Sequence, residues 1–157
     1  SLENRLRFVL EVLEAMSNVD GAGRVGLRIC PGFPFNDVKD PNPQETFEAL
    51  LMAIQPLQLA YLHVMRASPL NVIAMATEHF KGPFIVNGGY GAESAEKAIV
   101  KHQAAAVSFA TLFIANPDLV SRLRNSSGLA EVDQTTLYSA GREGYCDYPR
   151  SVPATDL

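Results

Sequence analysis

The chain shows its organisation most clearly in residues 83–109, whose sequence is PFIVNGGYGAESAEKAIVKHQAAAVSF. Residues 83–87 begin with a proline and continue with apolar side chains, which predicts a strand, and residues 105–109 predict a second strand. Between them, residues 92–102 place apolar side chains at helical spacing, and a glycine-rich run joins the first strand to this helix. A strand, a helix and a strand in this order predict a parallel β-α-β unit.

The same alternation extends through the rest of the sequence. Helices are predicted over residues 4–17, 44–55, 70–80 and about 116–124, and strands over 24–30 and 59–65. The apolar strands favour a parallel sheet covered on both faces. An open sheet of four strands would leave two edges with unpaired backbone groups, which folded proteins avoid or cover. Residues 128–157 are polar and contain Gly and Tyr, and we expect them to form an ordered C-terminal extension.

Length and composition limit the class of protein. The 157 residues are 47% apolar, which predicts one core and a single soluble unit over 1–157. No apolar run reaches the roughly 18 residues of a membrane helix. No secretion signal is visible at the N-terminus, so we expect a cytoplasmic protein. The formal charge is −4 without a basic cluster, which argues against nucleic acid and favours a small molecule as the partner.

The cysteines and histidines follow no metal-site pattern. Cys30 and Cys146 lie far apart without C-x-x-C spacing, so we expect reduced thiols. His79 and His102 fall in predicted helices and are expected at the surface. His63 lies within a strand and could face either side of the sheet. No metal and no catalytic triad are predicted.

Arg28 is the first candidate for a functional role. On the strand at 24–30, apolar side chains alternate with Gly26, Arg28 and Cys30, so Arg28 lies on the face opposite the apolar side chains, near the carboxyl end. Ligands of parallel β/α proteins bind at this end of the strands. The partner of the guanidinium is therefore an anion or the electron-rich edge of a ring, or else a carboxylate in an internal salt bridge.

Two loops are candidates for binding a phosphate. Residues 87–91, Asn-Gly-Gly-Tyr-Gly, join a strand to a helix, where backbone N–H groups at glycines can approach an anion. By itself this signal is weak, because Gly-rich turns are common. Residues 110–112 follow the last strand, and Asn116-Pro117 is a good start for the last helix. In β/α barrels the loops after strands seven and eight commonly form a phosphate site. If residues 87–91 and 110–112 are those two loops, they would face each other.

Seven segments occur in a fixed order along the chain. They are 1–8 (SLENRLRF), 25–28 (VGLR), 60–63 (AYLH), 81–84 (KGPF), 88–90 (GGY), 113–119 (FIANPDL) and 144–149 (GYCDYP). Together they resemble the old yellow enzyme family of FMN-dependent ene-reductases, and the similarity runs nearly from end to end. The resemblance implies an α/β fold, namely the C-terminal half (strands 5–8) of a (β/α)8 TIM barrel, that is, a half barrel with a C-terminal tail.

The resemblance also implies a cofactor and a reaction. Family members use NAD(P)H to reduce bound FMN, which passes hydride to the β-carbon of an activated alkene. Arg28 matches the arginine at the N1/O2 edge of the flavin, and the two glycines after Asn87 match the loop that holds the FMN phosphate. Tyr145 matches a tail tyrosine near the flavin and the substrate pocket. The predicted cofactor-binding residues are Arg28, Asn87, Gly88, Gly89, Ala110 and Thr111.

The chain departs from the family pattern at two strand ends. Where the family has Gly-Arg, whose arginine binds the phosphate, this chain has Ala110-Thr111. A charge-assisted contact contributes about 1.5–3 kcal/mol, so its loss is expected to weaken FMN binding about tenfold to a hundredfold. Where the family has Glu-Pro, this chain has Arg66-Ala67. Arg66 reverses a charge near the mouth of the barrel and is a candidate to supply the missing positive charge from another loop.

The catalytic residues of the family match no part of this chain. Its substrate-binding His-x-x-Asn (or His-x-x-His) motif and its proton-donating tyrosine belong to the upstream half, so no catalytic residue is identified here. We therefore expect activity only together with an N-terminal half barrel or a second copy in a dimer. The alternative is a flavin-free acid/base enzyme or a non-catalytic partner on the same scaffold.

Overall fold

The computed structural model describes residues 1–35, 37–67, 69–101 and 104–151. The chain divides into two compact units, Ser1–Ser108 and Phe109–Leu157. The first unit contains every strand of the described residues, and the second contains two short helices and the C-terminal tail. The single unit over 1–157 that the sequence suggested stays a prediction.

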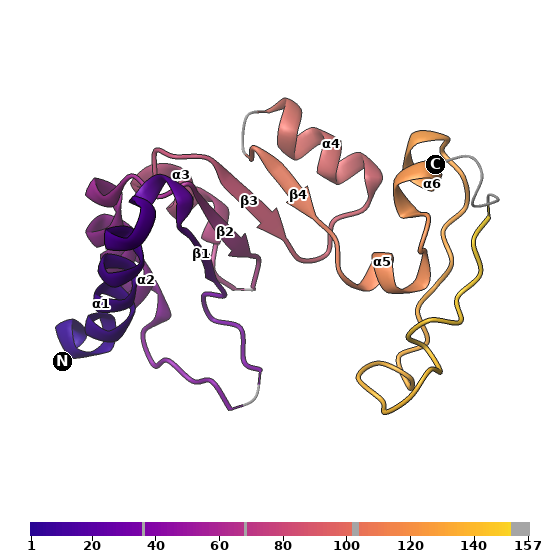
Figure 1. Cartoon of the computed structure of the whole chain (residues 1–157), viewed down its shortest axis with the longest axis horizontal. Helices are drawn as coiled ribbons and strands as arrows, with labels where there is room; N and C mark the ends of the chain where they lie inside the picture. Colours follow the sequence, from indigo (N-terminus) through magenta and orange to yellow (C-terminus); the bar gives the residue numbers. More distant parts are fainter. Residues whose placement is uncertain (36, 68, 102–103, 152–157) are drawn as a thin grey trace. The chain divides into compact units, whose positions relative to one another are not determined.

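The first unit is built on a parallel four-stranded sheet. Its strands are β1 (Gly26–Ile29), β2 (Tyr61–Met65), β3 (Phe84–Asn87) and β4 (Ala106–Ser108), in the order β1-β2-β3-β4 (Figure 1). Each strand therefore pairs with the next one along the chain, all in parallel. This is the arrangement expected for repeated β-α units, and it brings the carboxyl ends of all four strands to one edge.

Four helices connect or precede these strands. They are α1 (Leu2–Asp20), α2 (Pro43–Ile54), α3 (Val72–His79) and α4 (Ala92–Val100), with short 3-10 turns η1 (Ala22–Arg24) and η2 (Gln55–Leu57). Their starts have local causes. The Ser1 hydroxyl accepts from the Asn4 N–H, the Asn71 side chain accepts from the Ala74 N–H, and Pro43 occupies the first turn of α2, where a missing N–H costs nothing.

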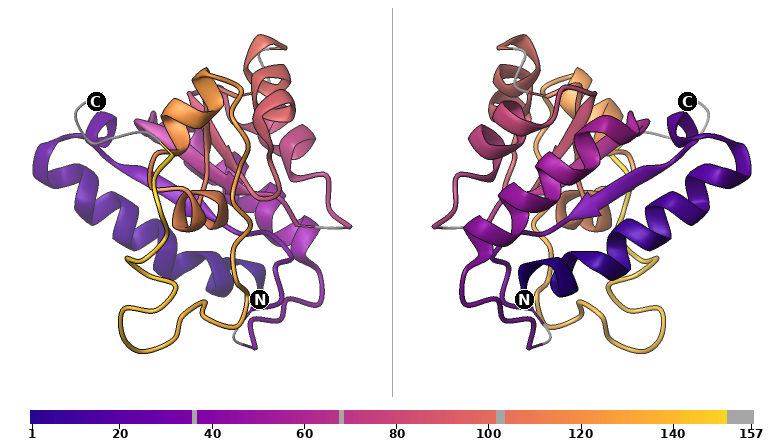
Figure 2. Two further views of the ribbon diagram at one scale, coloured as in Figure 1. Left: turned by 90° about the vertical axis from the view of Figure 1, so that its right-hand side faces the viewer. Right: turned by 90° about the vertical axis from the view of Figure 1, so that its left-hand side faces the viewer.

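The two faces of the sheet differ in burial. Leu62, Val64 and Val86 are at most 1% exposed and pack on the helix side, and the right-hand view of Figure 2 shows α1 and α2 in front of the strands. On the opposite face Arg28 is exposed and His63 is half-buried. Among the described residues of this unit, the sheet is thus covered by helices on one face, and the polar residues line the other.

The second unit corrects the prediction of one helix over 116–124. It contains α5 (Thr111–Ala115) and α6 (Leu119–Arg124), separated by Asn116 and Pro117. Proline lacks an N–H and is incompatible with a helix interior, so it ends the first helix. The Asn116 side chain links this break to the tail, since its Nδ2 donates to the Leu112 and Ala130 carbonyls at 2.9 and 3.0 Å and its Oδ1 accepts from the Ala130 N–H at 2.8 Å. The helix therefore starts after Asp118 and not at Asn116.

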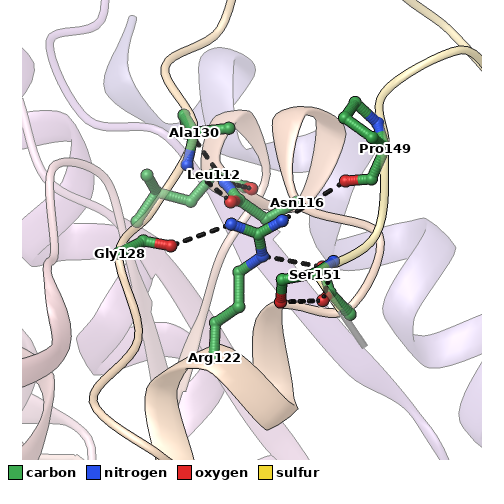
Figure 3. A network of polar contacts seen from close by, with 8 residues as sticks. Leu112, Asn116, Arg122, Gly128, Ala130, Pro149 and Ser151 are labelled. Atoms are coloured by element: carbon green, nitrogen blue, oxygen red, sulfur yellow. Dashed lines mark hydrogen bonds and ion pairs between the residues drawn. The ribbon is translucent and has the colours of Figure 1, made fainter. Parts of the chain in front are cut away.

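A buried polar network ties the described tail residues to α6 (Figure 3). Arg122 donates from Nε to Asp118 Oδ1 at 2.8 Å, from Nη1 to the Gly128 carbonyl at 2.8 Å and from Nη2 to the Pro149 carbonyl at 3.3 Å. Asp118 Oδ2 accepts from the backbone N–H and the hydroxyl of Ser151 at 2.8 and 2.6 Å. The tail up to Ser151 therefore has defined anchors, although it contains no helix or strand.

Candidate functional site

Arg28 is the centre of a polar cluster on the open face of the sheet. Its Nη1 lies 3.1 Å from His63 Nδ1 and 2.7 Å from His63 Nε2, and its Nη2 donates to Asn87 Oδ1 at 3.1 Å and to Met65 Sδ at 3.7 Å. The register explains the contact with His63, because Arg28 pairs with it on the adjacent strand. Met65 and Asn87 pair with each other two residues further along β2 and β3, so the long Arg28 side chain reaches them diagonally. Side chains at equal heights on one face become neighbours.

Ser108 completes the cluster on β4. His63 Nε2 lies 2.9 Å from the Ser108 hydroxyl, and Asn87 Nδ2 donates to the Ser108 carbonyl at 2.9 Å. The cluster of Arg28, His63, Asn87 and Ser108, called the strand-end cluster below, takes one residue from each strand.

His63 is uncharged in the strand-end cluster at neutral pH. Burial, and second the positive charge of Arg28, lower the pKa of the His63 imidazole below its ordinary range. A neutral imidazole can accept a hydrogen bond from the guanidinium, whereas an imidazolium would repel it. The partners of Arg28 in the cluster therefore do not offset its positive charge.

No carboxylate offsets the charge of Arg28 among the residues that the structure describes. The ion pairs there involve Arg5, Arg7, Arg24, Lys39, Lys97 and Arg122, and none involves Arg28. Of the two partners that the sequence left open, the internal salt bridge is not found in this part of the chain. An exposed guanidinium with neutral neighbours is suited to an anionic or electron-rich ligand.

The glycine turn follows the strand-end cluster directly. Asn87 is the last residue of β3, and Gly88 and Gly89 have φ values of 98° and 66°, a left-handed conformation that side chains other than glycine rarely adopt. The Gly91 N–H donates to Ser94 Oγ at 3.0 Å and so begins α4. The structure brings Asn87 into contact with Arg28, while the cofactor-binding role of Asn87, Gly88 and Gly89 stays a prediction.

The other predicted site residues lie in the second unit. Ala110 precedes α5 and Thr111 is its first residue, while Tyr145 lies in the tail and is 82% exposed. That the loop at 110–112 faces the loop at 87–91, and that Tyr145 borders a substrate pocket, remain predictions.

Sequence reasoning missed His63, Met65 and Ser108 as members of the site. The signal was present for His63, because the alternation Leu62, His63, Val64 on β2 repeats that of β1. Parallel pairing of successive strands then places His63 beside Arg28. His79, expected at the surface, is half-buried at the end of α3, and His102 lies outside the described residues.

Other kinds of site find no support among the residues that the structure describes. No group of three or more His, Cys, Asp or Glu there could hold a metal ion. Cys30 and Cys146 are free cysteines in the described part of the chain, and their reduced state stays a prediction. No helix in the described part of the chain is long and apolar enough to cross a membrane.

Comparison with known proteins decides the family. The model described as "NADH:flavin oxidoreductase / NADH oxidase family" matches residues 1–129. The chain belongs to this family. The predicted resemblance to old yellow enzymes is thereby confirmed, as is the α/β fold class, a part of a (β/α)8 barrel.

Several relatives extend well beyond the segment that this chain matches. A probable flavin mononucleotide-dependent alkene reductase of Leishmania infantum is 39% identical over 153 residues, which are 95% of this chain and 42% of that protein. A 12-oxophytodienoate reductase-like protein of Solanum lycopersicum is 35% identical, with the same shares. The chain therefore spans less than half the length of these relatives.

Solved structures of the family superpose on the chain. The old yellow enzyme from Trypanosoma cruzi has a TM-score of 0.87 at 34% identity, covering 97% of this chain and 42% of that one. Morphinone reductase in complex with tetrahydroNAD has a TM-score of 0.85 at 36% identity, covering 100% of this chain and 44% of that one.

The residues of the first unit fit the flavin mononucleotide that the family uses. A phosphate needs closely approaching backbone N–H groups, and the positive φ values of Gly88 and Gly89 keep that approach free of side chains. A flavin edge that becomes negative on reduction needs a cation without its own counter-charge, which Arg28 provides.

Proposed function

We propose that this chain supplies the phosphate loop and the flavin-edge arginine of an NAD(P)H-dependent FMN reductase of activated alkenes. One observation carries the proposal. The guanidinium of Arg28, which has no carboxylate partner among the described residues, donates to Asn87, the residue directly before the positive-φ turn at Gly88 and Gly89. When bound, FMN would accept hydride from NAD(P)H and deliver it to the alkene.

Arg28 would stabilise negative charge at the N1/O2 edge of the isoalloxazine ring. The guanidinium is held in place by Asn87 Oδ1 and by the neutral His63 ring, so little reorganisation is needed when the charge develops. Asn87 is in turn fixed by the Ser108 carbonyl at 2.9 Å. Asn87 and His63 are therefore positioning residues for Arg28.

The glycine turn would bind the phosphate through its backbone N–H groups, with Ala110 and Thr111 contributing from the loop after β4. Tyr145 would lie at the substrate pocket. No catalytic acid or base is assigned in this chain. We propose that the remaining flavin contacts and the proton donor come from an N-terminal half barrel, in the same protein or in a second chain.

The test compares the chain with and without such a half. The residues of the Leishmania infantum relative that precede its matched segment would be co-expressed with this chain, and oxidation of NADPH by 2-cyclohexen-1-one would be followed. We expect turnover only with both parts and added FMN. An Arg28→Ala chain in the same complex should lose most of it. The absence of FMN-dependent turnover in the assembled complex would overturn the proposal.

A second candidate function is a scaffold without flavin, either an acid/base enzyme or a non-catalytic partner. Ala110-Thr111 favours it, because no arginine stands at that strand end to bind a phosphate. Tight stoichiometric FMN in the native protein would count decisively against it.

A further inference from the structure

We propose that Arg66 is a phosphate-binding residue that makes the glycine turn select a phosphomonoester, and so FMN over riboflavin. This inference rests on the proposed function for the identity of the flavin, but its geometry is independent of it. Arg66 is the first residue after β2, and its backbone N–H donates to the Asn87 carbonyl at 2.9 Å. The loop after β2 is thereby fixed to the start of the glycine turn.

The side chain of Arg66 is held on the turn from two sides. Its Nε donates to the Gly88 carbonyl at 2.8 Å. Its guanidinium carbon lies 3.8 Å from the centroid of the Tyr90 ring, a cation–π contact. Both anchors belong to the same five-residue loop, so the arginine is placed before any ligand arrives. A preorganised guanidinium loses less conformational entropy on binding a ligand than a free one.

These two anchors leave the anion-binding part of the side chain available. The bond to Gly88 uses Nε, and the ring contact uses the face of the guanidinium. Its terminal amino groups form no hydrogen bond with an acceptor among the described residues, and no ion pair there involves Arg66. Two amino groups on a planar fork match two oxygens of a phosphate.

There is space for a phosphate beside Arg66. A hollow of about 490 Å³ is lined by both Arg66 and Gly88. A Cβ at Gly89 would lie 3.3 Å from Arg66 Nη2, so a side chain there would crowd the terminal amino group. The lack of a side chain at Gly89 therefore keeps the backbone and the guanidinium open to the same ligand.

The competing explanation is that Arg66 is only a brace between two loops. A brace acts through the hydrogen bond to the Gly88 carbonyl, which the side-chain amide of a glutamine can also donate, so Arg66→Gln would bind FMN like the native chain. A phosphate-binding residue acts through its positive charge, so Arg66→Gln would weaken FMN as Arg66→Ala does. Riboflavin, which lacks the phosphate, shows whether either change disturbs the rest of the flavin site.

The first experiment measures dissociation constants for FMN and riboflavin by flavin fluorescence, in the chain assembled with the N-terminal half. Arg66→Ala and Arg66→Gln are each expected to weaken FMN about tenfold to a hundredfold and leave riboflavin within about twofold. Arg24→Ala, an exposed arginine paired with Asp20, is the control and should change neither. Equal weakening of both flavins by Arg66→Ala, no weakening of either, or native FMN affinity in Arg66→Gln would overturn the inference while leaving the proposed function standing.

The second experiment decides the matter if the protein binds no flavin. Inorganic phosphate is titrated into the ¹⁵N-labelled chain, and the amide shifts of Gly88 and Gly89 are followed. We expect saturable shifts in the native chain that are lost in Arg66→Ala. In that case the proposed function fails and the phosphate site stands. If no flavin binds, unperturbed Gly88 and Gly89 amides, or shifts that persist in Arg66→Ala, would refute the role of Arg66.

Discussion

Two arginines, Arg28 in the first unit and Arg122 in the second, meet opposite surroundings. Arg122 is 9% exposed and donates to the carboxylate of Asp118 and to two backbone carbonyls. Arg28 is exposed and contacts an uncharged imidazole, an amide oxygen and a thioether. The first set of partners neutralises the charge, and the second only orients it.

This difference separates a structural arginine from a ligand-binding one. A buried charge must be paired, so the partners of Arg122 are a condition of folding for that unit. An exposed charge costs little when left uncompensated, and it remains available to attract a ligand. Substitution of each arginine should therefore act on a different property.

The largest effect on stability is expected at Arg122. Arg122→Ala leaves Asp118 buried without its cation and should lower the free energy of unfolding by about 3–5 kcal/mol. Arg124→Ala, exposed on the same helix, is the control and should change it by about 0.5 kcal/mol or less. Urea denaturation measures both. Equal effects of the two variants would remove the contrast between the arginines.

The next effect concerns ligand binding at Arg28. Arg28→Ala should weaken FMN about tenfold to a hundredfold, because the flavin edge loses its cation, while the free energy of unfolding changes by about 1 kcal/mol or less. The FMN affinity of Arg28→Lys should lie between those of the native chain and Arg28→Ala, since an ammonium keeps the charge and loses the planar fork. Flavin fluorescence and urea denaturation supply the two numbers. A stability loss as large as that of Arg122→Ala would show that Arg28 is structural.

A smaller effect on the free energy of unfolding should appear at acid pH, and it should come from Asp118. Hydrogen bonds from Ser151, and then from Arg122, hold the pKa of the Asp118 carboxyl far below its usual range. The unfolded chain therefore binds this proton first, and the stabilisation is present above about pH 4 and is lost as the pH falls below it. Urea denaturation across this range should show the loss in the native chain and less of it in Asp118→Asn. An identical acid slope in the variant would contradict the role of this network.

The smallest effect should come from His63 and begin at a higher pH. Because the pKa of His63 is lowered in the folded chain, the unfolded chain binds the proton more readily. Stability should therefore be complete above about pH 6.5 and decline below it. His63→Gln should flatten this decline, and His79→Gln should not. A decline that His63→Gln leaves unchanged would place its origin elsewhere.

The fold could be predicted from the sequence because the local signals agree with the arrangement of strands and helices in the structure. Apolar strands, helical periods and caps such as Asn71 each point to repeated β-α units. It failed at 111–124, where Pro117 ends one helix and the side chain of Asn116 links the break to the tail. That link depends on Ala130, which is distant in sequence.

The site was predicted only where the chemistry is local. Gly88 and Gly89 predict a turn by themselves, and Arg28 is a charged residue on an otherwise apolar strand. His63 and Ser108 join them only through strand register, and Arg66 reaches the turn through a bond to Gly88 and a contact with Tyr90. The sequence singles out Arg66 by its charge, but none of these contacts can be identified before the pairing of the strands is known.

The central claim is that this chain holds part of a flavin site that another half barrel completes. The most direct test is the visible absorption spectrum of the protein after incubation with FMN and removal of free flavin, with and without the N-terminal half. We predict a retained flavin band of one FMN per complex when both parts are present, and much less with this chain alone. A flavin-free spectrum in the assembled complex would contradict the claim.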